Sequence, residues 1–286
     1  IEKGILDAME SGTAWMPERK GKGSRDLPYP PGEAWEAAVE VLRASRGIAV
    51  NAADAESGIV TVSTVIPSGE LGTYASKIKK AIYPGTAHVT LWFEPVAGGT
   101  AVHTRMLLLE LGSLAPVPLA STEYLESSVL TALERRLRGD AGPLAVAESN
   151  YRGKAGFWSE LFSSDSIPAD AAGPKLDRLL PVSVDHAWGS ILRLISQNYF
   201  ISVCDGRGRR LSFITAHLSQ KREGYSSHRV QLTLSPDGDA TRLTLRIPPS
   251  IEPAAESEME MKAIESRIVT ELSFREEVPW LIGGMK

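Results

Sequence analysis

Cysteine is nearly absent from the chain, which has Cys204 alone among its 286 residues. A single cysteine excludes an intrachain disulfide framework and a zinc cluster built on thiolates. The residue before it is the apolar Val203, and the first basic residue after it is Arg207. Nothing nearby in the sequence would lower its pKa, so a reactive thiol at this position has no support.

Long apolar segments are also absent. No run of 18 apolar residues occurs, so no segment is predicted to cross a bilayer as a helix. The most apolar stretch, residues 106–120, is interrupted by Glu110, Gly112 and two prolines. A net charge of −4 and a pI near 5.8 give no general reason to bind nucleic acid or an anionic membrane.

The motifs of common enzyme classes are missing too. The chain has no P-loop, no nucleophile elbow and no His-Glu-x-x-His helix, and Gly206-Arg-Gly208 lacks the third glycine of a dinucleotide fingerprint. Asp54 and Asp205 each fall at a predicted hairpin turn, where a short carboxylate accepts hydrogen bonds from local backbone. We therefore expect no catalytic residue and no cofactor.

The histidines do not form a metal-binding pattern. No pair has the spacing of metal ligands, and the predicted hairpin places His103 opposite Trp92 instead of opposite His88. We expect no metal site. The five histidines are His88, His103, His186, His217 and His228.

Basic residues gather at two predicted loops of the second half of the chain. Arg207, Arg209 and Arg210 share one hairpin tip, and Lys221 and Arg222 lie on the next loop. A meander places these two loops at opposite ends of the sheet, and no aromatic residues interleave with them. We therefore expect no nucleic-acid binding.

What the sequence does contain is an internal duplication. Trp35, Val39 and Leu42 follow the spacing of one helical face, and the same spacing returns 153 residues later at Trp188, Leu192 and Ile195. A strand follows each helix, at residues 48–50 and 201–203. We expect Trp35 and Trp188 to be equivalent core residues between helix and sheet, and the two copies to superpose.

Each copy is predicted to be an α-β-β-β-β-α module of the α+β class. Its four strands form an antiparallel meander, and its helices pack on one face of that sheet. The predicted organisation along the chain is a flexible leader, the first module, a linker with an aromatic island, the second module and a tail. The corresponding ranges are 1–28, 29–139, 140–178, 179–275 and 276–286.

Three features of the sequence suggest contact surfaces. Trp92 points to the polar face of a strand whose Val89, Leu91 and Phe93 point inward, so something should cover it. The other module or the linker is one candidate cover, and an outside partner is the other. The linker island, Phe157-Trp158, is either a short helix docked on its own protein or an exposed aromatic motif.

The third feature is an insertion found only in the first copy. Residues 73–83 are predicted to form a short amphipathic helix between Gly72 and Pro84, with Tyr74 on its apolar face. This helix either only packs on the sheet edge or carries the partner-binding surface. In the second case three basic side chains would face an acidic group: Lys77, Lys79 and Lys80.

The residues Ala34-Trp35, Gly47-Ile48-Ala-Val50, Asp54 and Gly58, together with Asp185-His-Ala-Trp188, Ile201 and Asp205, resemble a known family. The pattern is similar to the tandem helix-grip domains of BamC-type bacterial lipoproteins, which are accessory subunits of the outer-membrane barrel-assembly machinery. The resemblance covers roughly residues 29–139 and 179–275. It implies a helix-grip-like fold and non-enzymatic scaffolding on the periplasmic side of a bacterial membrane. It also implies a lipid anchor, which is not present in this chain.

We therefore expect an envelope scaffold that binds a protein partner and meets the membrane only through a lipid anchor not present in this chain. A cytoplasmic location stays open. A carrier of a lipid or other apolar ligand is the alternative, and a hydrolase or transferase is the third class. A cavity between helix and sheet would favour the carrier, and a filled core would favour the scaffold.

Overall fold

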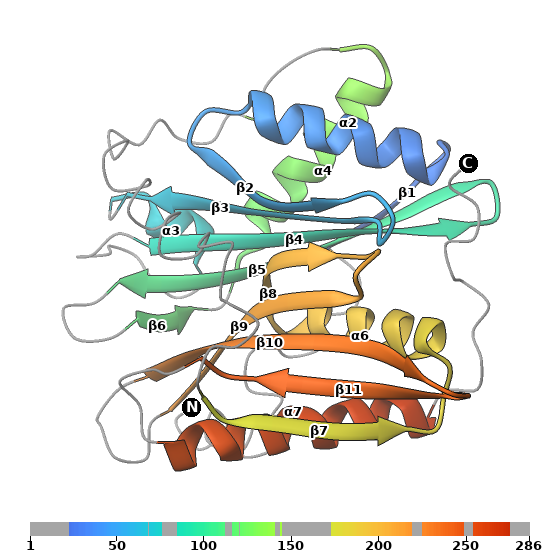
Figure 1. Ribbon diagram of the computed structural model, residues 1–286. Helices are drawn as coiled ribbons and strands as arrows, with labels where there is room; N and C mark the ends of the chain where they lie inside the picture. The colour runs from blue at the N-terminus through green and yellow to red at the C-terminus, as the bar shows by residue number, and fades with distance from the viewer. Residues whose placement is uncertain are drawn as a thin grey trace.

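The computed structural model describes residues 23–67, 69–75, 85–111, 116–119, 121–140, 144, 173–218, 225–248 and 254–274. It is an α+β structure with two antiparallel sheets, and the two long helices of each half lie on one side of its sheet (Figure 1). The two halves are stacked, with strand β8 of the second half lying next to the sheet of the first (Figure 1).

The first half is one antiparallel sheet with helices α2 and α4 on one face. Its strands run in the order β1-β5-β4-β3-β2, and β6 pairs with the far end of β5. The elements are β1 (Ser24–Leu27), α2 (Pro31–Ala44), β2 (Ile48–Asp54), β3 (Ile59–Ile66), α3 (Leu71–Tyr74), β4 (Gly85–Val96), β5 (Gly99–Leu111), β6 (Pro116–Leu119) and α4 (Tyr124–Leu137).

The second half has the same order without counterparts of α3 and β6 among the described residues. Its strands run in the order β7-β11-β10-β9-β8. The elements are β7 (Lys175–Leu180), α6 (Val184–Asn198), β8 (Phe200–Asp205), β9 (Arg210–Leu218), β10 (Tyr225–Asp237), β11 (Ala240–Arg246) and α7 (Ala254–Phe274). The predicted four-strand meander is therefore confirmed in both halves.

The prediction of four strands per module is wrong, because each half has another strand before its first helix. β1 pairs with residues 100–103 of β5, and β7 pairs with residues 241–246 of β11. Part of the predicted leader and part of the predicted linker therefore belong to the sheets. The sequence hides these strands because both are short, lie at a sheet edge and carry charged residues such as Arg25 and Lys175.

The spacing of the repeat also changes along the chain. The helices keep the offset of 153, but each strand pair has one bulge, between Val50 and Ala52 and between Ile201 and Val203, and these bulges lie 151 residues apart. The prediction that Ile48 corresponds to Ile201 is therefore wrong, and Val50 is its counterpart. The cause is a shorter connection after the second helix, since α6 ends at Asn198 and β8 begins at Phe200.

Alternating side chains build the core of each half as predicted. Val89, Leu91 and Phe93 of β4 are buried against α2 and α4, and the apolar residues of β10 and β11 are buried against α6 and α7. Of the two tryptophans, Trp188 is 2% exposed, whereas Trp35 is only partly buried and donates from Nε1 to the Ile59 carbonyl at 3.2 Å. The prediction that the two tryptophans are equivalent core residues is therefore wrong, because Trp188 is buried and Trp35 is only partly buried.

Candidate functional site at the module junction

The two halves meet where the helix-free face of the first sheet lies against strand β8 of the second. β8 contacts β2, β3 and β4, and both Ile59 and Trp92 of the first sheet pack against the apolar core of the second half. Cover of Trp92 by the other module is therefore confirmed. The expected register is also confirmed, since Trp92 pairs with His103 and their rings stack with centroids 5.0 Å apart.

The tips of two equivalent hairpins form one end of this junction. Asp54 Oδ2 accepts a hydrogen bond from the Ser57 backbone N–H, and Asp205 Oδ1 accepts one from Gly208, each at 2.8 Å. These contacts confirm the predicted structural role of both carboxylates. The tips approach so closely that a Cβ on Gly206 would lie 2.7 Å from Asp54 Oδ2, so a side chain there would force the Asp54 and Ser57 side chains to shift.

Arg209 connects this hairpin end to helix α6 and to the first half. It adopts a left-handed conformation with φ of 49°, which is unusual for a residue other than glycine. Its guanidinium pairs with Asp185 at 2.7 Å and with Glu56 at 3.8 Å, and it lies 5.6 Å from the ring centroid of Trp188. The corresponding turn in the first half has Gly58 in the same left-handed region.

Cys204 lies inside the junction and is not set up as a nucleophile. Its Sγ lies 3.9 Å from Asp54 Oδ2. Burial, reinforced by the negative charge of Asp54, raises the pKa of the thiol far above its usual value. The protonated thiol is a poor nucleophile, in agreement with the sequence-based interpretation.

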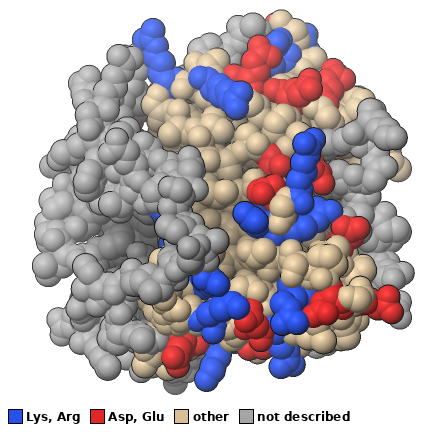
Figure 2. Space-filling view, viewed as in Figure 1, with Lys and Arg blue, Asp and Glu red and all other residues tan. Residues whose placement is uncertain are grey.

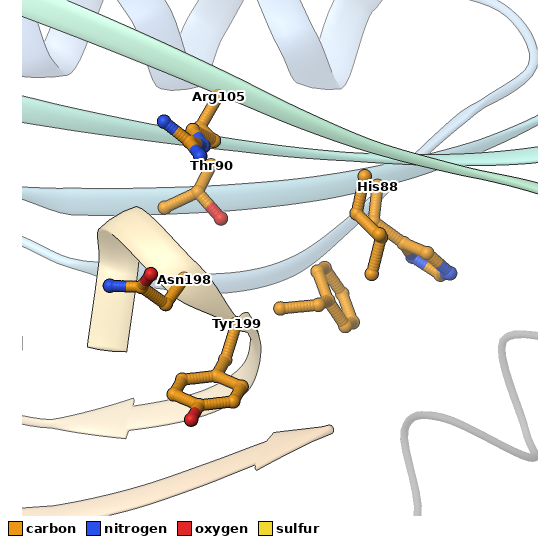
Figure 3. A pocket seen from close by; sticks show the side chains of 7 residues that line it. His88, Thr90, Arg105, Asn198 and Tyr199 are labelled. Carbon is orange, nitrogen blue, oxygen red and sulfur yellow. The ribbon is translucent and has the colours of Figure 1, made fainter. Parts of the chain in front are cut away.

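A pocket occupies the other end of the junction, where both halves contribute polar side chains. Figure 3 shows Arg105 and Thr90 of the first sheet on one side, with Asn198 and Tyr199 on the other, and His88 beside them. The Tyr199 hydroxyl accepts a hydrogen bond from Arg267 Nη1 of α7 at 2.7 Å, and burial raises its pKa. Leu107 and Phe200 complete the lining.

His88 is the most deeply buried polar group of this pocket. It is 2% exposed, and its ring centroid lies 4.1 Å from that of Phe200 in the second half. Burial lowers the pKa of His88 to about 3, so the ring is neutral at physiological pH. The sequence showed five scattered histidines, and only the docking of β8 distinguishes this one.

The size of the pocket limits what it can hold. Its cavity volume is about 10 Å³, which is roughly what one water molecule needs. As described, the pocket is large enough for a water molecule bound at the seam and too small for a metabolite.

The structure describes two of the seven predicted partner-binding residues. Tyr74 is 4% exposed and packs edge-to-face against Tyr124 with ring centroids 5.4 Å apart, so it belongs to the first core. Trp92 lies at the junction. The other five lie outside the described residues: Lys77, Lys79, Lys80, Phe157 and Trp158.

The predicted helix over residues 73–83 is wrong at its start. Helix α3 begins at Leu71, includes Gly72 and ends at Tyr74. Ala75 is extended and forms a β-bridge with Ser121, and Thr122 donates to the Tyr74 carbonyl at 2.9 Å. This backbone pairing with the segment before α4 ends the helix.

The described residues show neither a metal centre nor a membrane helix. No three His, Cys, Asp or Glu side chains among them come together in a way that would hold a metal ion. Within the same ranges no helix is both long and apolar enough to cross a membrane.

Comparison with known proteins places the chain in no family. No family model matches it, and no curated protein matches it. Several solved structures, among them the three that follow, are similar at a low level. TTHA0849 from Thermus thermophilus has 10% identity, 35% of this chain and 90% of that chain covered, and a TM-score of 0.20.

The other two cover more of the chain. The di-domain ARO/CYC StfQ from the steffimycin biosynthetic pathway has 8% identity, with 87% of this chain and 94% of that chain covered, and a TM-score of 0.21. DynU16, a protein of the dynemicin biosynthetic locus, has 11% identity, coverage of 87% and 95%, and a TM-score of 0.21. At these TM-scores the likeness carries nothing about activity or ligand.

Proposed function

We propose that the protein is a non-enzymatic scaffold that binds a protein partner, built from two helix-grip-like repeats held together as one body. The filled interior of both halves is the observation that carries this proposal. Large apolar side chains from helices and strands occupy the space between them, including Leu42, Leu91 and Leu130 in the first half and Trp188 and Phe213 in the second. A carrier would need that space for its ligand.

The junction supports the same proposal. The pocket between the halves has room for about one water molecule. At the opposite end of the junction the polar groups make structural contacts: Arg209 is paired with Asp185, and Asp54 accepts a hydrogen bond within its own turn. These side chains hold two modules in a fixed arrangement, which is the property a scaffold requires.

The resemblance to BamC-type lipoproteins adds an expected setting to the proposal. It implies a cell-envelope partner, a position on the periplasmic side of a bacterial membrane, and a lipid anchor. These elements rest on the residue pattern Ala34–Gly58 and Asp185–Asp205 alone.

Mass spectrometry of the tagged protein after gentle extraction from the source membranes tests the proposal. If the membranes are treated with a crosslinker before extraction, we expect protein partners to be recovered in substantial yield and no small molecule to co-purify. A lipid or other apolar molecule bound near one equivalent would show a carrier and contradict the proposal. The variant Gly206→Val is the control that shows whether partner binding depends on the docked arrangement of the two modules. Its added side chain would collide with Asp54 and Ser57 at the junction.

A further inference from the structure

The two halves have separate cores and share few side chains at their junction. Their buried apolar residues form two distinct clusters, and among the described residues of the first half only Ile59 and Trp92 pack against the second cluster. The main strand contacts across the junction are those of β8 with β2, β3 and β4. Each half could therefore keep its own core if the junction opened.

Polar side chains occupy much of the surface that is buried at the junction. Thr61 alternates with Val60 and Val62 of the first core, so its side chain lies on the helix-free face, where it is 0% exposed. Its hydroxyl has no hydrogen-bond partner among the described residues. Thr90 stands directly opposite Thr61 on β4 and is 3% exposed. Interfaces of this polar kind commonly allow domains to move relative to each other.

Ion pairs join the halves at the hairpin end of the junction. Glu56 of the first half lies 3.5 Å from Arg207 Nε and 3.8 Å from Arg209 Nη1 of the second, and Figure 2 shows basic and acidic side chains gathered between the two halves. The Arg207 side chain is 92% exposed, so solvent and salt weaken this pair. These pairs alone would hold the junction closed only weakly.

His88 lies at the other end of the junction and is covered by the second half. On its own sheet it stands between Ser63 of β3 and Leu107 of β5. Across the junction the Phe200 ring lies against it, with ring centroids 4.1 Å apart, and His88 is only 2% exposed. Opening the junction would remove Phe200 and give the imidazole access to water.

The groups that face His88 offer no support for a protonated ring. The pocket beside it is lined by Arg105 of β5 and by Asn198 and Tyr199 at the end of α6 (Figure 3), and Tyr199 accepts a hydrogen bond from Arg267 of α7. None of the seven lining residues is a carboxylate. Burial accordingly lowers the pKa of His88 to about 3. The docked state therefore excludes a proton that the open state would accept.

From this arrangement we propose that the junction is an acid-released contact, in which a proton on His88 separates the two halves while each half keeps its fold. The separation would uncover Ile59, Trp92 and Phe200, which are apolar side chains that a partner could then bind. Histidine suits such a switch because it changes charge between neutral and mildly acidic pH. The proposal goes beyond the scaffold function and does not depend on it, because the junction opens or stays closed whatever the protein binds.

The size of the effect follows from the proton balance. An imidazole with access to water has a pKa near 6.5, so at about pH 5 the ring is almost fully protonated in the open state and neutral in the docked state. The docking equilibrium should therefore shift toward the open state by about 30-fold between about pH 7.5 and about pH 5.

Cysteine reporters on the two faces of β3 test the proposal on the full chain. T61C places a thiol on the junction face and V62C places one in the first core, each in a C204S background that removes the native thiol. Labelling with dithiodipyridine, relative to the urea-denatured chain at the same pH, measures how often each thiol is exposed. Undocking should expose T61C far more often than V62C at both pH values. Labelling of T61C should rise about 30-fold from about pH 7.5 to about pH 5.

Histidine variants in the T61C background assign the proton. H88Q has no ring to protonate, so the relative labelling should not change with pH, and H88N repeats this test with a second side chain in case H88Q disturbs the docking. H103Q removes another histidine of the same sheet face and should keep the full pH response. Circular dichroism confirms that each variant is folded at both pH values.

Equal labelling of T61C and V62C would overturn the proposal, because the junction would then open only when the first half unfolds. The absence of a pH response in T61C would overturn it as well. A pH response that both H88Q and H88N keep would show that another group takes the proton, which also contradicts the proposal. The scaffold proposal is judged by the molecules that co-purify, so its failure would leave these labelling rates unchanged.

Discussion

His88 should make the folded protein sensitive to mild acid. Its ring is buried between the first sheet and Phe200, and burial lowers its pKa to about 3, against a value near 6.5 in the unfolded chain. A base whose pKa is lowered on folding binds its proton better when unfolded. The stabilising contribution is therefore complete above pH 6.5 and is lost as the pH falls from 6.5 toward 3.

The size of the effect follows from linkage. At about pH 5 the unfolded histidine is almost fully protonated and the folded one is not, which amounts to about 2 kcal/mol of unfolding free energy relative to neutral pH. Between the two pKa values each further pH unit adds about 1.4 kcal/mol to this loss. The value at pH 5 changes little if the folded pKa is about 4 instead of 3, because the folded ring is still neutral there.

Urea unfolding at about pH 7.5 and pH 5 measures this contribution when the wild type is compared with H88Q. The variant has no ring to protonate, so its stability should fall by about 2 kcal/mol less than that of the wild type over this interval. H103Q is the matched control, since it lies on the same sheet face but keeps His88 and should keep the wild-type pH difference. Equal pH differences in the wild type and H88Q would refute the burial of His88 at the junction.

Three further predictions concern single side chains. Glu126 is 4% exposed and accepts a hydrogen bond from Ser121 at 2.9 Å, and burial raises its pKa, so its ionisation opposes folding as the pH rises above 4.5. E126Q should therefore raise the urea midpoint at neutral pH, with a smaller gain below pH 4.5. A lower midpoint at neutral pH would contradict this prediction. W188A should lose about 3–5 kcal/mol of unfolding free energy and W35A clearly less, because Trp35 is partly exposed; similar losses would show equal burial. R209G should be more stable than R209A by about 1 kcal/mol, since glycine tolerates the left-handed backbone, and thermal unfolding of both variants gives the comparison.

Much of the architecture could be predicted because the signals were local. Alternation along β10 and β11 and the helical spacing of Leu125, Val129 and Leu133 depend on short stretches that choose one buried face. The hairpin register that pairs Trp92 with His103 followed from one turn. The edge strands β1 and β7 could not be found this way, because their pairing with β5 and β11 is between segments far apart in the chain.

The junction could not be predicted for a related physical reason. His88 and Phe200 lie 112 residues apart in sequence, and their contact depends on how one module docks on the other. The polar face of β4 showed only that Trp92 needed a cover.

The asymmetry between the two faces follows from how duplicated modules stack. β8, at one edge of the second sheet, covers the helix-free face of the first sheet, whereas Leu179 of β7, at the opposite edge of the second sheet, is 55% exposed. An exposed sheet face must either resist aggregation or bind a partner, and charged side chains serve both purposes. At this edge the register sets Arg246 directly opposite Lys175, and the Asp177 carboxylate pairs with Lys175 at 2.5 Å, which offsets part of the repulsion between the two cations.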